Sequence, residues 1–72
     1  MVDILDMVNR KKIRHLRKEV LRLSNKEATR RAGFRSLRRW HAVESGETVA
    51  PPLPTMAAIA KVLGTTIDEL ME

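Results

Sequence analysis

Apolar residues recur at helical spacings through most of the chain, and no stretch alternates strictly between apolar and polar residues. Helical spacing gives a helix one apolar stripe, whereas a half-buried strand needs a period of two. The pattern therefore predicts helices and no sheet. Cap and turn residues divide the chain into five expected helices, at residues 3–22, 25–32, 37–45, 55–63 and 67–71.

The first expected helix is long, and its apolar stripe slips in phase between Val8 and Ile13. Residues on the two sides of such a slip cannot face the same core from one straight helix. We therefore expect a break or kink near Asn9. Residues 1–9 are then a candidate N-terminal arm.

Serine and glycine mark the limits of the next two helices. Ser24 is a typical N-cap, and Glu27 three residues later completes the pattern of a capping box. Ser36 is expected to cap the following helix, and Gly33 and Gly46 are expected to end the two helices as left-handed C-caps.

Proline limits the next connection. Three prolines fall within residues 47–54, which predicts a stiff loop there. The fourth helix is expected to begin at Pro54 or Thr55. A second capping box, Thr66 with Glu69, is expected to open the short last helix.

Residues 24–45 have the layout of a helix-turn-helix motif, in which a glycine-containing turn joins two short helices. Small residues such as Ala28 let the helices cross closely, and Trp40 fills the space between them. Core packing is a better role for Trp40 than base stacking, because a stacking platform needs companion aromatics. The predicted core of the motif is Ala28, Ala32, Gly33, Phe34, Trp40 and Val43.

Charge divides this 72-residue chain unevenly. Residues 1–41 carry 13 Lys or Arg against 4 acids, and residues 42–72 carry one Lys against 5 acids. A strongly basic half favours a face that meets a polyanion. DNA, RNA, an anionic membrane and a merely solvated basic surface all remain open on charge alone. The length allows a single domain, here residues 1–72.

Three stretches, taken together, resemble the Xre family, which is the Cro and phage-repressor class of DNA-binding domains. They are LSNKEATRRAG, WHAVESGE and TMAAIAKVLGTTIDEL, beginning at Leu23, Trp40 and Thr55. The resemblance implies an all-α fold, a compact five-helix bundle whose third helix enters the major groove. The chain departs from the family in its turn, because Phe34 and Arg35 precede Ser36 where the family has one residue.

The resemblance also assigns roles by position. It implies that the DNA bases are faced by Ser36, Leu37, Arg38, Arg39, His41 and Ala42. It implies phosphate contacts from Asn25, Lys26, Arg35, Arg17 and Lys18. Two adjacent arginines at a helix start oppose the helix dipole, which favours contact with a polyanion over plain solvation. Which of the two reads a base stays open, as does whether His41 contacts DNA or only solvent.

The sequence thus predicts a sequence-specific, double-stranded-DNA-binding transcriptional regulator of phage or bacterial type, with repression favoured. One helix reads only a few base pairs, so we expect a homodimer, at least on DNA, that binds two operator half-sites. The expected location is the cytoplasm, with the nucleoid. Candidate dimer contacts are apolar residues left over once the core is filled, namely Leu70, Met71, Ile4 and Leu5.

Other functional classes fit less well. A helix-turn-helix-derived protein–protein module, an antiactivator or adaptor that has lost DNA binding, is the main alternative. A membrane-surface helix formed by residues 4–20 is a weaker one, because capped helices follow it. The chain has no Cys and two His, and it lacks a nucleophile–base spacing or a glycine-rich phosphate cradle. We therefore expect no metal, no cofactor and no enzyme activity.

Overall fold

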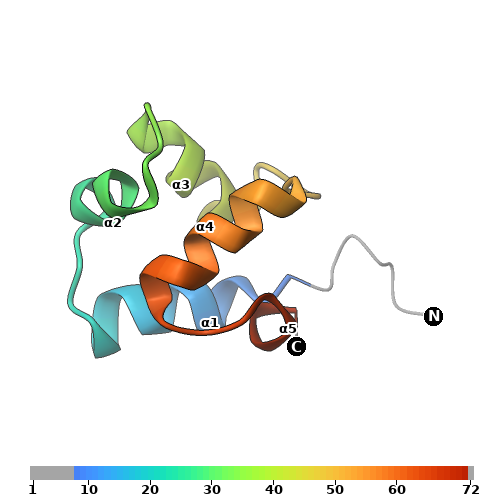
Figure 1. The fold of residues 1–72 in the computed structure, drawn as a ribbon, viewed down its shortest axis with the longest axis horizontal. Helices are drawn as coiled ribbons and strands as arrows, with labels where there is room; N and C mark the ends of the chain where they lie inside the picture. The colour runs from blue at the N-terminus through green and yellow to red at the C-terminus, as the bar shows by residue number, and fades with distance from the viewer. Residues whose placement is uncertain (1–7, 72) are drawn as a thin grey trace.

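The computed structural model describes residues 8–71, and these residues form helices and turns without any strand. The predicted all-α class is therefore confirmed. Five α-helices, one of them continued by a π-helical turn, make up the fold shown in Figure 1. The elements are α1 (Arg10–His15), η2 (Leu16–Val20), α2 (Asn25–Ala32), α3 (Leu37–Ser45), α4 (Leu53–Leu63) and α5 (Ile67–Leu70).

The expected break at Asn9 is confirmed. The Asn9 side chain accepts a hydrogen bond from the Lys12 backbone N–H, so it is the N-cap of α1. The Asn9 N–H donates to the Leu70 carbonyl over 2.7 Å, and Val8 is 7% exposed within the core. Both residues therefore belong to the folded body, which corrects the boundary of the arm. The remaining arm residues, 1–7, lie outside the described residues.

The first helix was predicted to run to residue 22, but it ends at Val20 in a wide, π-helical turn. In η2 the Leu21 N–H donates to the Leu16 carbonyl, five residues back, over 2.9 Å. Arg22 then adopts φ 54°, and the Leu23 N–H bonds the Arg17 carbonyl. This turn ends the helix and leads the chain into α2.

The predicted bounds of α2 and α3 are confirmed, because both are set by local caps. Ser24 and Ser36 accept hydrogen bonds from backbone N–H groups in the first turns of their helices. Gly33 at φ 77° and Gly46 at φ 90° end the helices in the left-handed region, which disfavours any side chain. Only one half of the predicted capping box forms. The Ser24 hydroxyl accepts from the Glu27 N–H, but the Glu27 carboxylate accepts hydrogen bonds from the Arg30 guanidinium.

Helix α4 begins earlier than predicted. It starts at Leu53 rather than at Pro54 or Thr55, and Pro52 is its N-cap. A proline in the first turn costs no hydrogen bond, because the N–H groups there have no partner within the helix. The proline-rich loop therefore ends before Leu53. Thr66 caps α5 as expected, by accepting from the Glu69 N–H.

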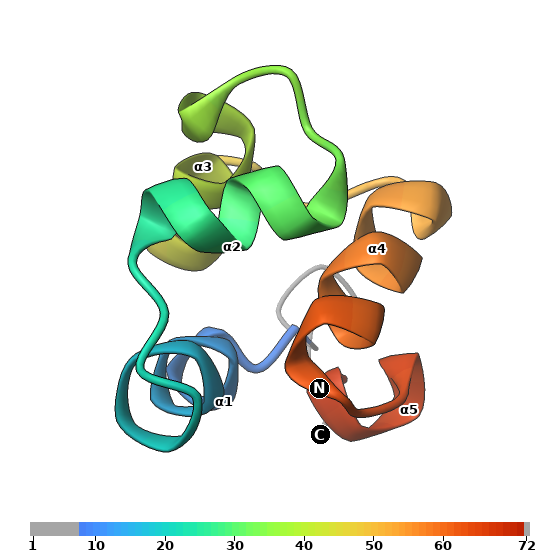
Figure 2. The same ribbon diagram turned by 60° about the vertical axis from the view of Figure 1, so that its left-hand side comes forward.

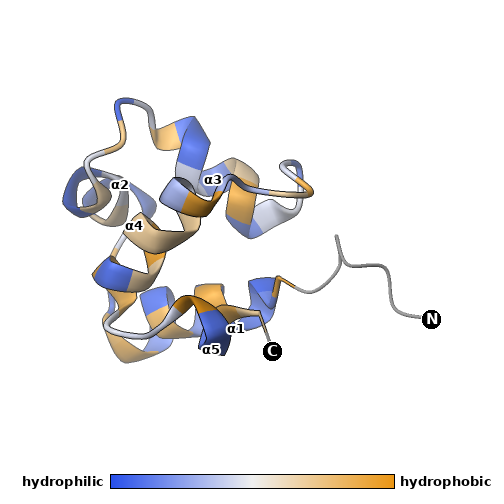
Figure 3. Cartoon of the chain, turned by 45° about the vertical axis from the view of Figure 1, so that its right-hand side comes forward, coloured by the Kyte–Doolittle hydropathy of each residue, from blue (hydrophilic) through white to orange (hydrophobic). Residues whose placement is uncertain are grey.

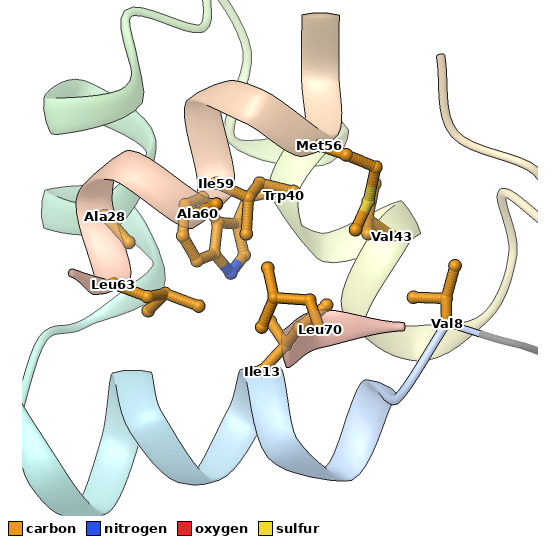
Figure 4. Packing of buried hydrophobic residues seen from close by; sticks show 10 residues of the cluster. All are labelled: Val8, Ile13, Ala28, Trp40, Val43, Met56, Ile59, Ala60, Leu63 and Leu70. Carbon is orange, nitrogen blue, oxygen red and sulfur yellow. The ribbon is translucent and has the colours of Figure 1, made fainter. Parts of the chain in front are cut away.

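Trp40 is the centre of the core and is 0% exposed (Figure 4). Side chains from α1, α2, α3, α4 and α5 surround it, namely Ile13, Ala28, Val43, Met56, Ile59, Ala60, Leu63 and Leu70, with Val8 at one end. The core role predicted for Trp40 is confirmed.

Ala32 and Phe34 pack against this cluster from partly buried positions. Gly33 is exposed, so its assignment to the core was wrong, and its role is the C-cap of α2.

Helix α3 contacts helices on both sides of the fold, and α4 connects α2 to α5. Helix α1 packs against α3 and α5, whereas α2 packs against α3 and α4 (Figure 2). Coloured by hydropathy, α4 is the most apolar of the long helices, and the outer turns of α2 and the start of α3 are polar (Figure 3). Within residues 8–71, no helix is both long and apolar enough to span a bilayer.

Burial of Leu70 corrects one dimer prediction. Leu70 is 0% exposed inside the monomer core, so it cannot also form a seam between two chains. Met71 is partly buried against the same core. Ile4 and Leu5 lie outside the described residues.

We expect Trp40→Ala to destabilise the domain severely, because it removes the largest fully buried side chain. Loss of a buried Trp costs about 3–5 kcal/mol, which is a large share of the stability of a small domain. Leu37→Ala is the control, since Leu37 is 49% exposed, and its effect should stay within about 0.5 kcal/mol. Urea unfolding followed by circular dichroism measures both. Equal stability of the two variants would contradict this core.

Candidate nucleic-acid interface

The start of α3 and the start of α2 share one solvent-facing hollow. It is lined by Ser36, Leu37, Arg38 and His41 from the start and outer side of α3, and by Asn25 from α2. Ser36, Leu37, Arg38 and His41 are exposed. Four of the six predicted base-facing residues therefore lie together with one predicted phosphate-contacting residue.

The two adjacent arginines lie on different sides of α3. The Arg38 side chain is 80% exposed, and its Nη2 atom lies 3.3 Å from Oε1 of Glu47. The Arg39 guanidinium instead lies over the Phe34 ring, 5.6 Å from its centroid. Arg39 lines a separate hollow with the turn residues Gly33, Phe34, Arg35 and Ser36. The hollow shared with α2 therefore contains Arg38 and not Arg39.

Phe34 accommodates the longer turn. Its N–H donates to the Thr29 carbonyl over 3.1 Å, and its ring centroid lies 6.3 Å from that of Trp40 at an interplanar angle of 52°. The predicted place of Phe34 in the core of the motif is supported by this contact and by its packing, partly buried, against the core. The additional residue is thus taken up inside the turn, and Ser36 still caps α3.

Ala42 does not face solvent. Its side chain is 8% exposed, and its carbonyl accepts from the Thr48 N–H over 2.9 Å, which draws the following loop against α3. The prediction that Ala42 faces a base was therefore wrong. It failed because Ala42 is buried in the folded domain, and residue spacing within α3 does not show which side of the helix is covered.

Arg17 is committed to the interior, so the predicted phosphate contact was wrong. It is 8% exposed, its Nε and Nη2 donate to the Glu44 carboxylate over 2.9 and 2.8 Å, and its Nη1 donates to the Leu23 carbonyl over 2.7 Å. This bidentate pair joins η2 to α3. Lys18, also predicted to contact phosphate, is exposed.

Glu44 is the acceptor of this cluster. Besides Arg17, the Trp40 indole Nε1 donates to its carboxylate over 2.7 Å. Burial pushes the pKa of Glu44 upward, but hydrogen bonds from Arg17 and Trp40, and the charges of Arg17 and Arg14, outweigh it. The pKa of Glu44 therefore lies below its usual value, and the carboxylate is charged at neutral pH.

Of the remaining predicted phosphate-contacting residues, Asn25 and Lys26 begin α2, and Arg35 lies in the turn before α3. Lys26 and Arg35 are exposed, and Asn25 is partly buried. The buried Asn25 Oδ1 has no hydrogen-bond partner within residues 8–71. A second hollow beside Asn25 is lined by Arg14 and His41, and also by Arg17, Glu44 and Ser45.

Arg14 is the neighbour of this site that the sequence reasoning missed. It reaches the hollow from α1, one residue after the inward-facing Ile13. The helical phase of α1 relative to Ile13 is the signal that could have shown it. Phase alone, however, does not say that this side of α1 adjoins α2 and α3.

Residues 8–71 contain no group of three His, Asp or Glu side chains able to hold a metal ion. Of their acids, Glu27, Glu44, Glu47 and Glu69 form ion pairs with Lys or Arg.

A model of a helix-turn-helix domain family matches residues 11–72. The chain belongs to this helix-turn-helix domain family. Its membership agrees with the Xre and Cro resemblance of the sequence, and the matched residues include α2, the turn and α3. Domains of this kind bind DNA and are typically not enzymes. No curated protein and no solved structure matches the chain.

The lowered pKa of Glu44 predicts acid lability. Because folding favours its charged form, the stabilisation is complete above the unfolded-state pKa of about 4.3 and is lost as pH falls through the folded-state pKa. Glu44→Gln should lower the free energy of unfolding at pH 7 by about 1–3 kcal/mol and flatten its fall below about pH 4.5. Urea unfolding between pH 7 and pH 2.5 measures this. Parallel profiles for the two proteins would contradict the role given to Glu44.

Proposed function

We propose that this helix-turn-helix domain is a sequence-specific double-stranded-DNA-binding transcriptional regulator that reads an operator through α3. The observation that carries the proposal is the shared hollow, where the exposed residues Leu37, Arg38 and His41 of α3 adjoin Asn25 at the start of α2. A helix of the length of α3 fits the major groove, and residues at its N-terminal end then reach the base edges. Occupation of the operator makes repression the favoured mode.

Within this proposal, Arg38 is the base reader. Its guanidinium is 80% exposed and lies in the shared hollow, so it can reorient toward the O6 and N7 atoms of guanine. Arg39 is held over Phe34 at the turn, a position better suited to a phosphate. Leu37, 49% exposed, offers an apolar contact to a thymine methyl group.

Phosphate contacts would flank the reading turn on both sides. Lys26 and Asn25 lie at the N-terminus of α2, where free backbone N–H groups and the helix dipole also favour an anion. Arg35 lies in the turn between the helices and is exposed. These contacts would fix the register of α3 in the groove without carrying sequence information.

A homodimer on two half-sites is part of the proposal, because a single helix reads too few base pairs for useful specificity. Met71 remains a candidate dimer contact. It lines an apolar groove with Val49 and Leu53, which are 46% and 67% exposed, and with Val8 and Met56. Cytoplasmic, nucleoid-associated action follows from the same proposal.

Selection from a random duplex library at about 150 mM salt should recover a palindromic operator. On that operator, Arg38→Ala should cost about 1–3 kcal/mol and relax the preference at one base pair. Arg39→Ala is the matched control, and it should weaken binding with the base preference kept. Binding curves on the operator and on single-base variants measure both.

Two results would contradict the proposed function. If both arginine variants fold and bind operator and random duplex as the wild type does, α3 is not the reading element. Failure of the selection to enrich any sequence would likewise favour the protein–protein module.

Salt dependence tests the phosphate contacts. If a dimer neutralises roughly 6–10 phosphates, log K should fall against log salt with a slope of about −5 to −9. Lys26→Ala should weaken binding to all sequences alike and reduce the steepness of this slope by about one unit per half-site. Fluorescence anisotropy between 50 and 300 mM salt measures it. A slope near zero for the wild type would contradict polyanion binding.

A further inference from the structure

The basic residues of the first helix fall into two groups by the direction in which they point. One group is bound to the rest of the fold. Arg10 donates to the Thr48 and Val49 carbonyls, Lys12 pairs with Glu69 over 2.9 Å, and Arg17 pairs with Glu44 over 2.8 Å. These three cations hold the helix to the loop after α3, to α5 and to α3, and are therefore structural.

The second group lies on the outer side of α1 and η2. Lys11, Arg14, His15 and Lys18 are all exposed, and together with Glu19 they line one shallow surface hollow. Their spacing of three, four and seven residues places them side by side along the helix. Neither Lys11 nor Lys18 forms an ion pair with an acid of residues 8–71. The charges of Lys11 and Lys18 therefore do not connect elements of the fold through ion pairs in this part of the chain.

This outer row is continuous with the candidate interface. Arg14 lines the hollow of the row and also the hollow that contains Asn25 and His41. A polyanion that contacts the starts of α2 and α3 and passes Arg14 would therefore meet Lys11 and Lys18 next. The surface has the charge and the linear form that a nucleic-acid backbone requires, since it presents the cations Lys11, Arg14 and Lys18 with a single acid, Glu19, among them.

We propose that Lys11, Arg14, His15 and Lys18 form a flanking strip that contacts backbone phosphates of duplex DNA outside the base pairs read by α3. This inference rests on the proposed function, in that α3 sets which DNA lies beside the strip. The strip adds affinity and salt dependence but no sequence preference, because phosphates are the same at every base pair. It extends the surface through which a monomer holds DNA from α2 and α3 onto α1.

The test uses a fluorescein-labelled 30-base-pair duplex of mixed sequence and the intact chain. Binding is measured by fluorescence anisotropy between 50 and 200 mM NaCl. Lys11→Ala and Lys18→Ala should each reduce the steepness of the log K against log salt slope by about 0.9 per bound protomer. Over that range, each variant should lose roughly threefold less affinity than the wild type does. Lys61→Ala, which removes an exposed cation of α4 outside the strip, is the matched control and should leave the slope unchanged.

Folding does not obscure the result, because Lys11 and Lys18 are exposed, and thermal melts of the variants check it. Wild-type slopes for both strip variants would overturn the proposal. An equal reduction of the slope by Lys61→Ala would also overturn it, because that result would indicate an effect of net charge alone. Sedimentation with vesicles containing phosphatidylserine is a further arm, and binding there with unchanged duplex slopes would assign the strip to a membrane instead.

Failure of the strip and failure of the proposed function give different results. If Arg38→Ala relaxes base preference while the Lys11→Ala and Lys18→Ala slopes match the wild type, α3 reads DNA and the strip is wrong. If the strip variants lower the slope while no sequence is preferred and Arg38→Ala changes nothing, the strip holds and sequence-specific reading is wrong.

Discussion

The buried ion pair between Arg17 and Glu44 is the interaction on which the arrangement of the motif depends. It joins η2 to α3, and the same carboxylate accepts from the Trp40 indole while the same guanidinium donates to the Leu23 carbonyl. Trp40 therefore has both its ring and its N–H fixed at the crossing of α2 and α3. Removing one partner would leave an unpaired charge in the interior, which is far more costly than the net gain from forming the pair.

The π-helical turn makes this cluster possible. The turn between Leu16 and Leu21 widens the end of the first helix, and the chain then reverses through Arg22 at φ 54°. The Leu23 carbonyl is thereby brought back to the Arg17 guanidinium. A π-turn is an uncommon feature that persists where surrounding contacts support it, and here the three hydrogen bonds of one arginine side chain provide that support.

Charge has two separate uses in this small domain. Cations such as Arg17, in the interior, and Lys12, nearer the surface, pair with acids distant in sequence and connect elements of the fold. Exposed cations such as Lys11 and Lys18 form no ion pair within residues 8–71 and are available to an external anion. Because no ion pair within residues 8–71 involves Lys11, Lys18 or Lys26, the exposed surface of the first half stays strongly basic. The same composition thus gives a stable fold and a surface suited to a polyanion.

The amino-acid sequence alone was sufficient for the features that depend on neighbouring residues. The bounds of α2 and α3, their serine and glycine caps and the central place of Trp40 all follow from local hydrogen bonding and helical phase. The roles of Arg17 and Ala42 depended instead on the tertiary structure. Whether a cation meets solvent or a carboxylate 27 residues away is decided by how the helices pack, and no local signal records it. The burial of Ala42 and the separation of Arg38 from Arg39 were decided in the same way, by contacts between elements that the chain brings together only when it folds.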